Sequence, residues 1–309
     1  MTDQALQLAG DFAAPTREQW EKEVLKVLNR RRPEGKELTI EQAMARLRFT
    51  TADGLSIEPL YTIDGDPEPL GYPGIMPFTR GTTVRAGSGW DIRALHEDPD
   101  VAASNAAVLD DLQRGATSIW LRVGPDAIAP ADVPRVLAGV RPELCAISVS
   151  AVEDQQAAAE ALAAFFRAAG HAADVVGNLG VDPLGAAALT GEPADLGVLA
   201  PAVQAAREFP GVRALVVDAL PYDDAGAGDV EVLAYALATG VAYVRALDAA
   251  GVGAEEAFGQ IAFRVPASAD QFLTIARLRA LRRLWARVGE VLGVPEASRG
   301  ALQHGVTSR

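Results

Sequence analysis

The sequence predicts an α/β fold built from repeated strand–helix units. From residue 90 onward, short runs rich in β-branched residues alternate with alanine-rich helical runs of ten or more residues. This alternation implies a parallel sheet with right-handed crossovers. With 309 residues, 49% of them hydrophobic, the chain is long enough to bury one large core. Periodicity alone leaves a doubly wound sheet and a closed barrel equally open.

Six strands and the start of a seventh can be placed along the chain. The strands are expected at residues 90–95, 118–123, 145–151, 173–177, 212–219 and 261–265, with the seventh near Gln303. The clearest helices are expected at residues 101–114, 154–169 and 268–292, and arginines decorate the last of these. Arginines at this density usually mark a solvated or salt-bridged helix face, and an anion site is the alternative. No residues remain for an eighth strand.

Residues 1–70 are expected to form an N-terminal arm, and residues 71–309 the main domain. Thr16 with Gln19, and Thr39 with Gln42, have capping-box spacing and predict the starts of two helices. Residues 49–62 then read as extended chain. Such an arm has little core of its own, so it is expected to pack on the main domain or on a partner subunit.

Charge and composition exclude several classes of partner. The net charge of −13 argues against nucleic acid or an anionic membrane surface, since phosphate binding needs a basic face. No apolar run approaches the roughly 20 residues of a membrane span, and the N-terminus lacks a signal-peptide pattern. We therefore expect a cytoplasmic protein without a membrane partner.

The usual signatures of metal, phosphate and thiol chemistry are missing. His96, His171 and His304 are too scattered in the sequence to predict a metal site. The Gly-rich turns complete neither a GxGxxG nor a Walker pattern. The single cysteine, Cys145, begins an apolar run, which favours a buried, inert thiol over a nucleophile.

The segment from residue 71 to 93 is an ordered loop rich in glycine and proline. Composition alone would also allow a linker here. Its run Tyr-Pro-Gly-x-x-Pro-Phe-Thr-Arg-Gly at 72–81, followed by Trp-x-Ile-Arg at 90–93, resembles the signature of the methylmalonyl-CoA mutase family. In that family the segment threads the axis of a (β/α)8 barrel along the pantetheine of the acyl-CoA. The resemblance implies residual substrate binding at Tyr72 and Arg80.

Later stretches carry the same resemblance, which extends from about residue 40 to the C-terminus. Residues 104–121 and the arginine-rich helix at 272–288 are similar to family segments in the same order. The resemblance therefore implies a TIM-type (β/α)8 barrel, incomplete here with about six to seven βα units, preceded by the helical and extended arm.

Polar groups that active family members carry at their strand tips are replaced. Pro221 stands where the family has a histidine that hydrogen-bonds the thioester carbonyl, and proline has no side-chain donor or acceptor. Gly180 and Val306 stand where it has amide side chains, and a tyrosine has no counterpart within 82–89. This pattern is similar to the small, non-catalytic subunit of heterodimeric mutases and implies no catalytic residue in this chain.

The resemblance also implies partners and a cofactor. The cobalamin motif Asp-x-His-x-x-Gly is not found in the sequence, so we expect no cobalamin-binding domain and no cofactor in this fragment, with adenosylcobalamin bound elsewhere in the intact mutase. The implied partner is the large catalytic subunit, and self-association of the fragment stays open. The chain is thus expected to be the N-terminal barrel fragment of a small mutase subunit.

Two further expectations concern activity and the barrel axis. The alternative is an active acyl-CoA mutase or acyl-CoA-binding enzyme with a different residue set, for which Tyr222, Asp223 and Arg80 are the candidates. If substrate does not thread the barrel, side chains should fill its axis. The side chains considered for this filling are Trp120, Leu121, Ile147 and Val149.

Overall fold

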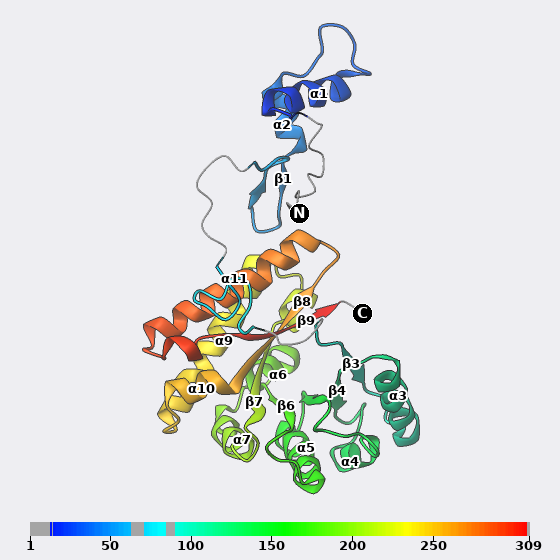
Figure 1. Cartoon of the computed structure of the whole chain (residues 1–309), viewed down its shortest axis with the longest axis vertical. Coiled ribbons are helices and arrows are strands. Elements are labelled where there is room, and N and C mark those ends of the chain that lie inside the picture. Colours follow the sequence, from blue (N-terminus) through cyan, green and yellow to red (C-terminus); the bar gives the residue numbers. More distant parts are fainter. Residues whose placement is uncertain (1–12, 14, 63–70, 85–89, 308–309) are drawn as a thin grey trace, which may run out of the picture. The chain divides into compact units, whose positions relative to one another are not determined.

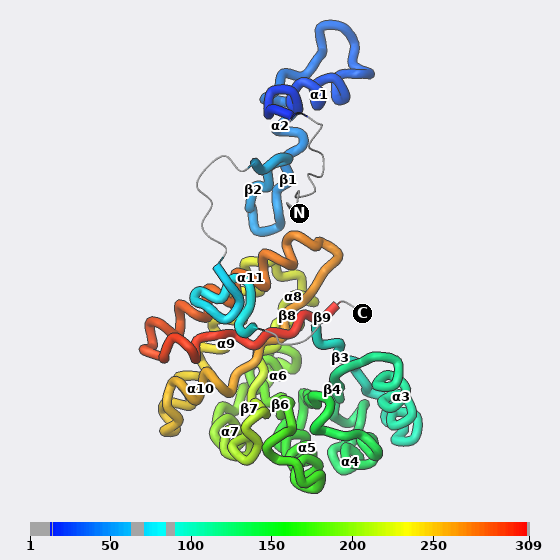
Figure 2. The backbone as a smooth tube through the Cα atoms, in the orientation of Figure 1, coloured from blue at the N-terminus to red at the C-terminus, as the bar shows by residue number. Residues whose placement is uncertain are grey.

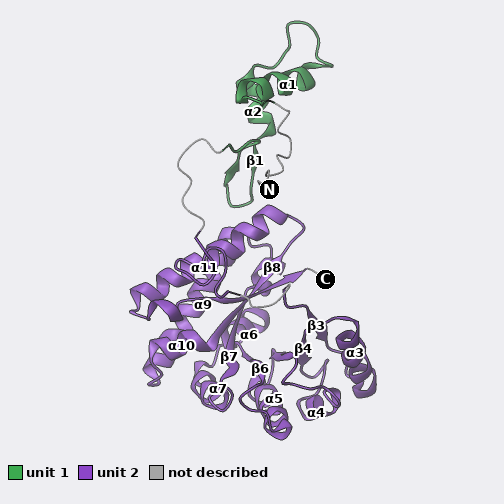
Figure 3. Ribbon diagram, in the orientation of Figure 1, with its two compact units in different colours: residues 1–68 green, residues 69–309 purple. Residues whose placement is uncertain are grey.

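The computed structural model describes residue 13 and residues 15–62, 71–84 and 90–307. The chain forms two compact units, residues 1–68 and residues 69–309 (Figure 3). Each unit is considered by itself.

The first unit contains two capped helices and a short hairpin. Helix α1 spans Arg17–Asn29, helix α2 spans Ile40–Leu47, and strands β1 (Phe49–Thr50) and β2 (Ser56–Ile57) pair antiparallel. Both predicted capping boxes are present, with reciprocal side-chain and backbone hydrogen bonds at the start of each helix.

The first unit has almost no core. Within its described residues only Ala43 and Thr51 are buried, and α1 buries none of its side chains. Its large apolar side chains are exposed instead: Val27, Leu47, Phe49, Leu55 and Tyr61. The predicted lack of an independent core is confirmed, so helices as short as α1 and α2 gain little from packing within this unit, and an exposed pair such as Arg48–Glu58 adds little more.

The second unit is built on a curled, seven-stranded parallel sheet (Figure 1). Its strands are β3 (Arg93–His96), β4 (Ser118–Val123), β5 (Ala146–Ala151), β6 (Val176–Val181), β7 (Gly211–Asp218), β8 (Ile261–Ala267) and β9 (Leu302–Thr307). They pair in chain order from β3 to β9. A doubly wound sheet reverses its strand order at a switch point, so this order fits an open half-barrel of TIM type instead.

Helices lie around the outside of the curled sheet (Figure 2). They are α3 (Val101–Arg114), α4 (Val133–Val136), α5 (Gln155–Ala169), α6 (Pro183–Thr190), α7 (Leu199–Ala206), α8 (Leu220–Asp224), α9 (Asp229–Ala249), α10 (Ala254–Gln260) and α11 (Gln271–Val291). Three short 3-10 turns lie at Pro130–Asp132, Leu196–Val198 and Glu296–Ser298.

Most sequence-predicted elements match the structure, with two shifted strands. The strand at 118–123 and the helix at 101–114 are confirmed residue for residue. Strand β6 begins at Val176 instead of residue 173, because residues 171–175 form a turn in which Asp174 N–H donates to the His171 carbonyl. Strand β3 begins at Arg93 instead of residue 90.

The core lies between the convex face of the sheet and the helices. Trp285 of α11 is fully buried, stacks on Phe258 at 4.3 Å between ring centres and meets Phe263 edge-on at 4.9 Å. Gly240 of α9 passes so close that a Cβ there would lie 2.8 Å from the Trp285 ring. The glycine is therefore required for the close packing of α9 on α11.

Helix α9 has the length and hydropathy of a membrane span, with a mean hydropathy of 1.4, which the sequence analysis did not anticipate. It packs against α11, α10 and the sheet, and its buried residues include Val232, Ala236, Tyr243 and Leu247. A core helix of a soluble α/β unit has the same properties.

A buried ion pair ties α11 to α9. Arg277 is 6% exposed, and its guanidinium donates to Asp229 Oδ1 and, at 3.0 Å, to the Pro266 carbonyl. Asp223 lies 3.7 Å away. The predicted salt-bridged face is therefore confirmed for Arg277, whose charge lies inside the unit, while Arg287 pairs with Glu290 at the surface.

We expect Arg277→Ala to destabilise the protein by about 3 kcal/mol, because it removes a buried guanidinium and leaves the partly buried Asp229 carboxylate without its cation. Arg287→Ala on the same helix removes an exposed pair and should cost less than about 1 kcal/mol. Urea unfolding followed by circular dichroism measures both. Equal losses for the two variants would contradict this account of α11.

Candidate functional site on the concave face of the sheet

Strand alternation separates an apolar face from a polar one. In β4, Ser118 and Trp120 point to the concave face, while Leu121 points toward the helices and is fully buried. Ile147 and Val149 of β5 also belong to the helix-covered core. The expectation that these three aliphatic residues fill the barrel axis is therefore wrong, and Trp120 alone of the four faces it.

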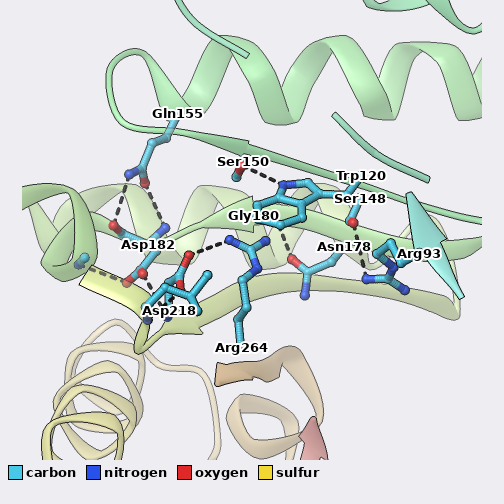
Figure 4. A network of polar contacts seen from close by, with 12 residues as sticks. Arg93, Trp120, Ser148, Ser150, Gln155, Asn178, Gly180, Asp182, Asp218 and Arg264 are labelled. Atoms are coloured by element: carbon cyan, nitrogen blue, oxygen red, sulfur yellow. Dashed lines mark hydrogen bonds and ion pairs between the residues drawn. The ribbon is translucent and has the colours of Figure 1, made fainter. Parts of the chain in front are cut away.

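An arginine crosses the concave face. Arg264 of β8 is 6% exposed and lies with its Cζ 3.9 Å from the ring centre of Trp120 on β4, four strands away across the curl (Figure 4). Its Nη1 is 2.5 Å from Asp218 Oδ2. The Trp120 indole N–H donates to Ser150 Oγ at 2.7 Å. Side chains from distant strands of the sheet therefore meet on the concave face.

A second arginine joins the first strand to the third. Arg93 donates to Ser118 Oγ at 2.9 Å and to Ser148 Oγ at 3.3 Å, and it pairs with Asp91 at 3.3 Å (Figure 4). Burial, followed by the charges of Arg93 and Arg264, lowers the pKa of His304 on β9 to about 3. His304 is therefore neutral at physiological pH.

Gly180 has a structural reason to be glycine. Strand β6 shifts register against β7 between Asn178 and Val181, and Gly180 takes a φ of +72° in this bulge. A Cβ there would lie 1.8 Å from the Val149 carbonyl oxygen. The Asn178 amide bridges the irregularity, donating to the Leu215 carbonyl at 3.0 Å and accepting from Gly180 N–H at 2.7 Å. No side chain fits at position 180 in this backbone.

Asp182 ends β6 as a buried carboxyl group. It accepts hydrogen bonds from the Tyr243 hydroxyl, from Gly185 N–H at 3.1 Å and from Asp218 N–H at 3.0 Å. The Gln155 side chain makes two hydrogen bonds with the backbone of Asp182: its amide nitrogen donates to the Asp182 carbonyl and its oxygen accepts from the Asp182 N–H (Figure 4). Burial raises the pKa of Asp182 to about 6 despite these donors. The sequence analysis missed this group, although an Asp-Pro pair that ends a strand and caps a helix was a usable signal.

Pro221 and Val306 lie where local structure accepts them. Pro221 is in the first turn of α8, where a backbone N–H would have no hydrogen-bond partner within the helix. Tyr222 stacks on Tyr235 with ring centres 4.6 Å apart, and Asp223 faces Arg277. Val306 pairs with Pro266 across β8 and β9. None of these contacts leaves an obvious acid–base pair among the described residues.

The glycine- and proline-rich loop lies against α11 and the start of β9. Arg282 donates to the Phe78 carbonyl at 2.9 Å and the Thr79 carbonyl at 2.7 Å, and Thr82 Oγ1 donates to the Ala301 carbonyl at 2.5 Å. Tyr72 is 72% exposed. The structure therefore places the described part of this segment on helix α11, and residues 85–89, which include part of the expected tyrosine gap, lie outside the described residues.

Arg80 borders two adjacent hollows. One, of about 470 Å³, is lined by Pro73, Gly81–Val84, Arg282 and Ala301–Gln303, and the other, of about 280 Å³, by Thr79, Ile275, Leu278, Arg279 and Arg282. Of the candidates for the alternative enzyme, Tyr222 and Asp223 lie together on α8, while Arg80 lies on the glycine- and proline-rich loop. Cys145 is buried, and burial raises the pKa of its thiol to about 11, which agrees with an inert cysteine.

Comparison with known proteins places the chain among mutases. The family model described as methylmalonyl-CoA mutase matches residues 197–309. A methylmalonyl-CoA mutase small subunit of Propionibacterium freudenreichii subsp. shermanii is 54% identical over 312 residues, covering 100% of this chain and 49% of the relative. The small subunit of Streptomyces virginiae is 44% identical over 315 residues, covering 100% and 50%.

A probable small subunit of Mycobacterium tuberculosis (strain ATCC 25618 / H37Rv) is 39% identical over 266 residues, covering 84% of this chain and 43% of the relative. The chain spans about half the length of the curated relatives it matches. The resemblance noted in the loop and in α11 is thus confirmed over the whole chain. The chain belongs to the methylmalonyl-CoA mutase family and is similar to its small subunits.

Proposed function

We propose that this chain is the N-terminal barrel part of the small subunit of adenosylcobalamin-dependent methylmalonyl-CoA mutase. In this proposal it is a structural, non-catalytic component of the enzyme that interconverts methylmalonyl-CoA and succinyl-CoA. A large subunit carries the active site. The observation that carries the proposal is the side-chain plug Trp120–Arg264–Asp218 across the concave face of a chain whose relatives are named small subunits.

The plug is incompatible with a substrate-threading role. An acyl chain that followed the axis would have to displace the Arg264–Trp120 stack and separate Arg264 from Asp218 inside the unit. Breaking a buried ion pair by moving one partner costs several kcal/mol. Gly180 and Pro221, which stand where active family members carry an amide and a histidine, have no polar side chain that could compensate by donating to a thioester.

The histidines do not fit a cobalt ligand. When bound to a mutase, adenosylcobalamin supplies the radical that starts the rearrangement. His96 is 7% exposed and lies 3.4 Å from Asp111, and His304 is enclosed near Arg93 and Arg264. His171 is exposed, but it has neither the Asp two residues before it nor the Gly three residues after it that the cobalamin motif carries. We therefore assign the cofactor to the large subunit. Cytoplasmic location remains a prediction from composition.

Purified chain, supplied with adenosylcobalamin and methylmalonyl-CoA, should form no succinyl-CoA above background in a chromatographic assay. The double change Gly180→Gln with Pro221→His should also give none, because the backbone cannot place a side chain at position 180. An active family enzyme measured in parallel serves as the positive control. Turnover by the unmodified chain alone would disprove the non-catalytic assignment.

Gly180→Ala should destabilise the protein by at least about 3 kcal/mol more than Gly191→Ala. The two glycines have similar φ values, +72° and +77°. A Cβ at Gly180 would clash with the Val149 carbonyl, whereas a Cβ at Gly191 would meet nothing within 4 Å. Gly191→Ala therefore measures the backbone strain alone, about 1–2 kcal/mol. Urea unfolding compares them, and equal losses would show that β6 relaxes around the methyl group.

The buried Asp182 should make stability fall as pH rises from 4 to 6. The folded pKa of about 6 lies above the ordinary value of 3.8, so in this window the folded state holds a proton that the unfolded state releases. A gap of this size corresponds to about 3 kcal/mol of unfolding free energy.

Asp182→Asn removes the titrating group. The unfolding free energy of the wild type, minus that of Asp182→Asn, should therefore decrease as the pH rises from 4 to 6. Urea titration at each pH measures it. Asp110→Asn, at an exposed pair with Arg114, is the matched control and should leave the pH profile unchanged. A pH-independent difference for Asp182→Asn would refute the buried-acid account.

A further inference from the structure

Three arginines that have no carboxylate partner among the described residues gather beside the loop and α11. Arg80, Arg279 and Arg282 all line the hollow of about 280 Å³. Within the described part of the chain, Arg282 binds only carbonyl and amide oxygens, and neither Arg80 nor Arg279 has an ion-pair partner. Burial lowers the pKa of Arg282, and the nearby charge of Arg279 lowers it further, so the two cations are close. Such a cluster is unexpected in a chain with a net charge of −13.

An apolar strip continues from these arginines along the same helix face. Phe272 is 80% exposed and Ile275 is 42% exposed. Positions 272, 275, 279 and 282 follow helical spacing, so the four side chains form one stripe about 15 Å long. The opposite face of α11 is the buried one that carries Leu281 and Trp285.

The stripe has the composition of a protein interface. Aromatic and arginine side chains are enriched in interfaces, and a large exposed phenylalanine beside unpaired cations is unusual for a free surface. A small anion in the hollow would neutralise the arginines but leave Phe272 in water. A protein segment that carries both carboxylates and apolar side chains covers the whole stripe.

We propose that the stripe Phe272–Ile275–Arg279–Arg282 docks an acidic, amphipathic segment of the large mutase subunit. This inference rests on the proposed function, which supplies the partner. The partner's apolar residues would cover Phe272 and Ile275, and its carboxylates would pair with Arg279 and Arg80. Arg282 also holds the loop through Phe78 and Thr79, so the docking surface and the loop share one support.

The charges on the two partners predict how the affinity of this contact depends on salt. Most of the surface of a chain with net charge −13 repels an acidic partner, so attraction is confined to the arginine cluster. Screening of these pairs should therefore weaken binding as salt rises. Weakening the apolar half with the uncharged change Ile275→Gln should weaken binding without changing its salt dependence.

The test measures binding of purified large mutase subunit to the full chain by isothermal titration calorimetry. We expect Phe272→Asp and Arg279→Glu each to raise Kd at least tenfold, with Arg279→Glu also reducing the dependence on salt. Val291→Asp and Arg287→Glu, at exposed positions of the same helix, are the matched controls and should leave Kd unchanged. Thermal melting checks that each variant is folded, and Ile275→Gln is the milder second variant.

The outcomes separate the two proposals. If the wild-type chain does not bind the large subunit, the proposed function fails and this inference fails with it. If it binds and Phe272→Asp, Ile275→Gln and Arg279→Glu bind equally well, the docking site is wrong while the proposed function stands. If coenzyme A displaces the large subunit and its own binding needs Arg279 but not Phe272, the site belongs to a small anionic ligand and the docking proposal is overturned.

Discussion

The alternation of side chains along seven parallel strands is the constraint on which this structure depends. Successive residues of a strand point to opposite faces, so Leu121 enters the helix-covered core while its neighbour Trp120 enters the concave face. Because the strands pair in chain order and the sheet curls, polar residues of distant strands meet on one side. The apolar core and the polar plug are therefore two consequences of one pattern.

Much of the fold was predictable because it depends on local periodicity. The helix at 101–114 and the strand at 118–123 follow from patterns within a few residues of each position. Local periodicity could not decide between a doubly wound sheet and a half-barrel, because the order in which strands pair is a property of the whole chain. Resemblance to a family supplied that choice, and the observed order from β3 to β9 fits it.

The site was less predictable, because its contacts depend on sheet register. Arg264 meets Asp218 on the neighbouring strand and Trp120 across the curl, and no spacing in the sequence brings the three together. Replacement of a polar group by Gly180 could be noticed in the sequence, but the reason for glycine is the Val149 carbonyl of another strand. The position of the loop likewise depends on Arg282, which sequence analysis assigned to a salt-bridged or solvated face.

At the strand tips, polar side chains are already engaged in bonds within the unit. A catalytic group needs a free donor or acceptor directed at the substrate. Here the carboxyl of Asp182 is bound by Tyr243 and by two backbone N–H groups, and the carboxylate of Asp218 is bound by Arg264. Substrate could gain these groups only by breaking bonds inside the unit, so the polar interior favours the closed fold over any ligand in the axis.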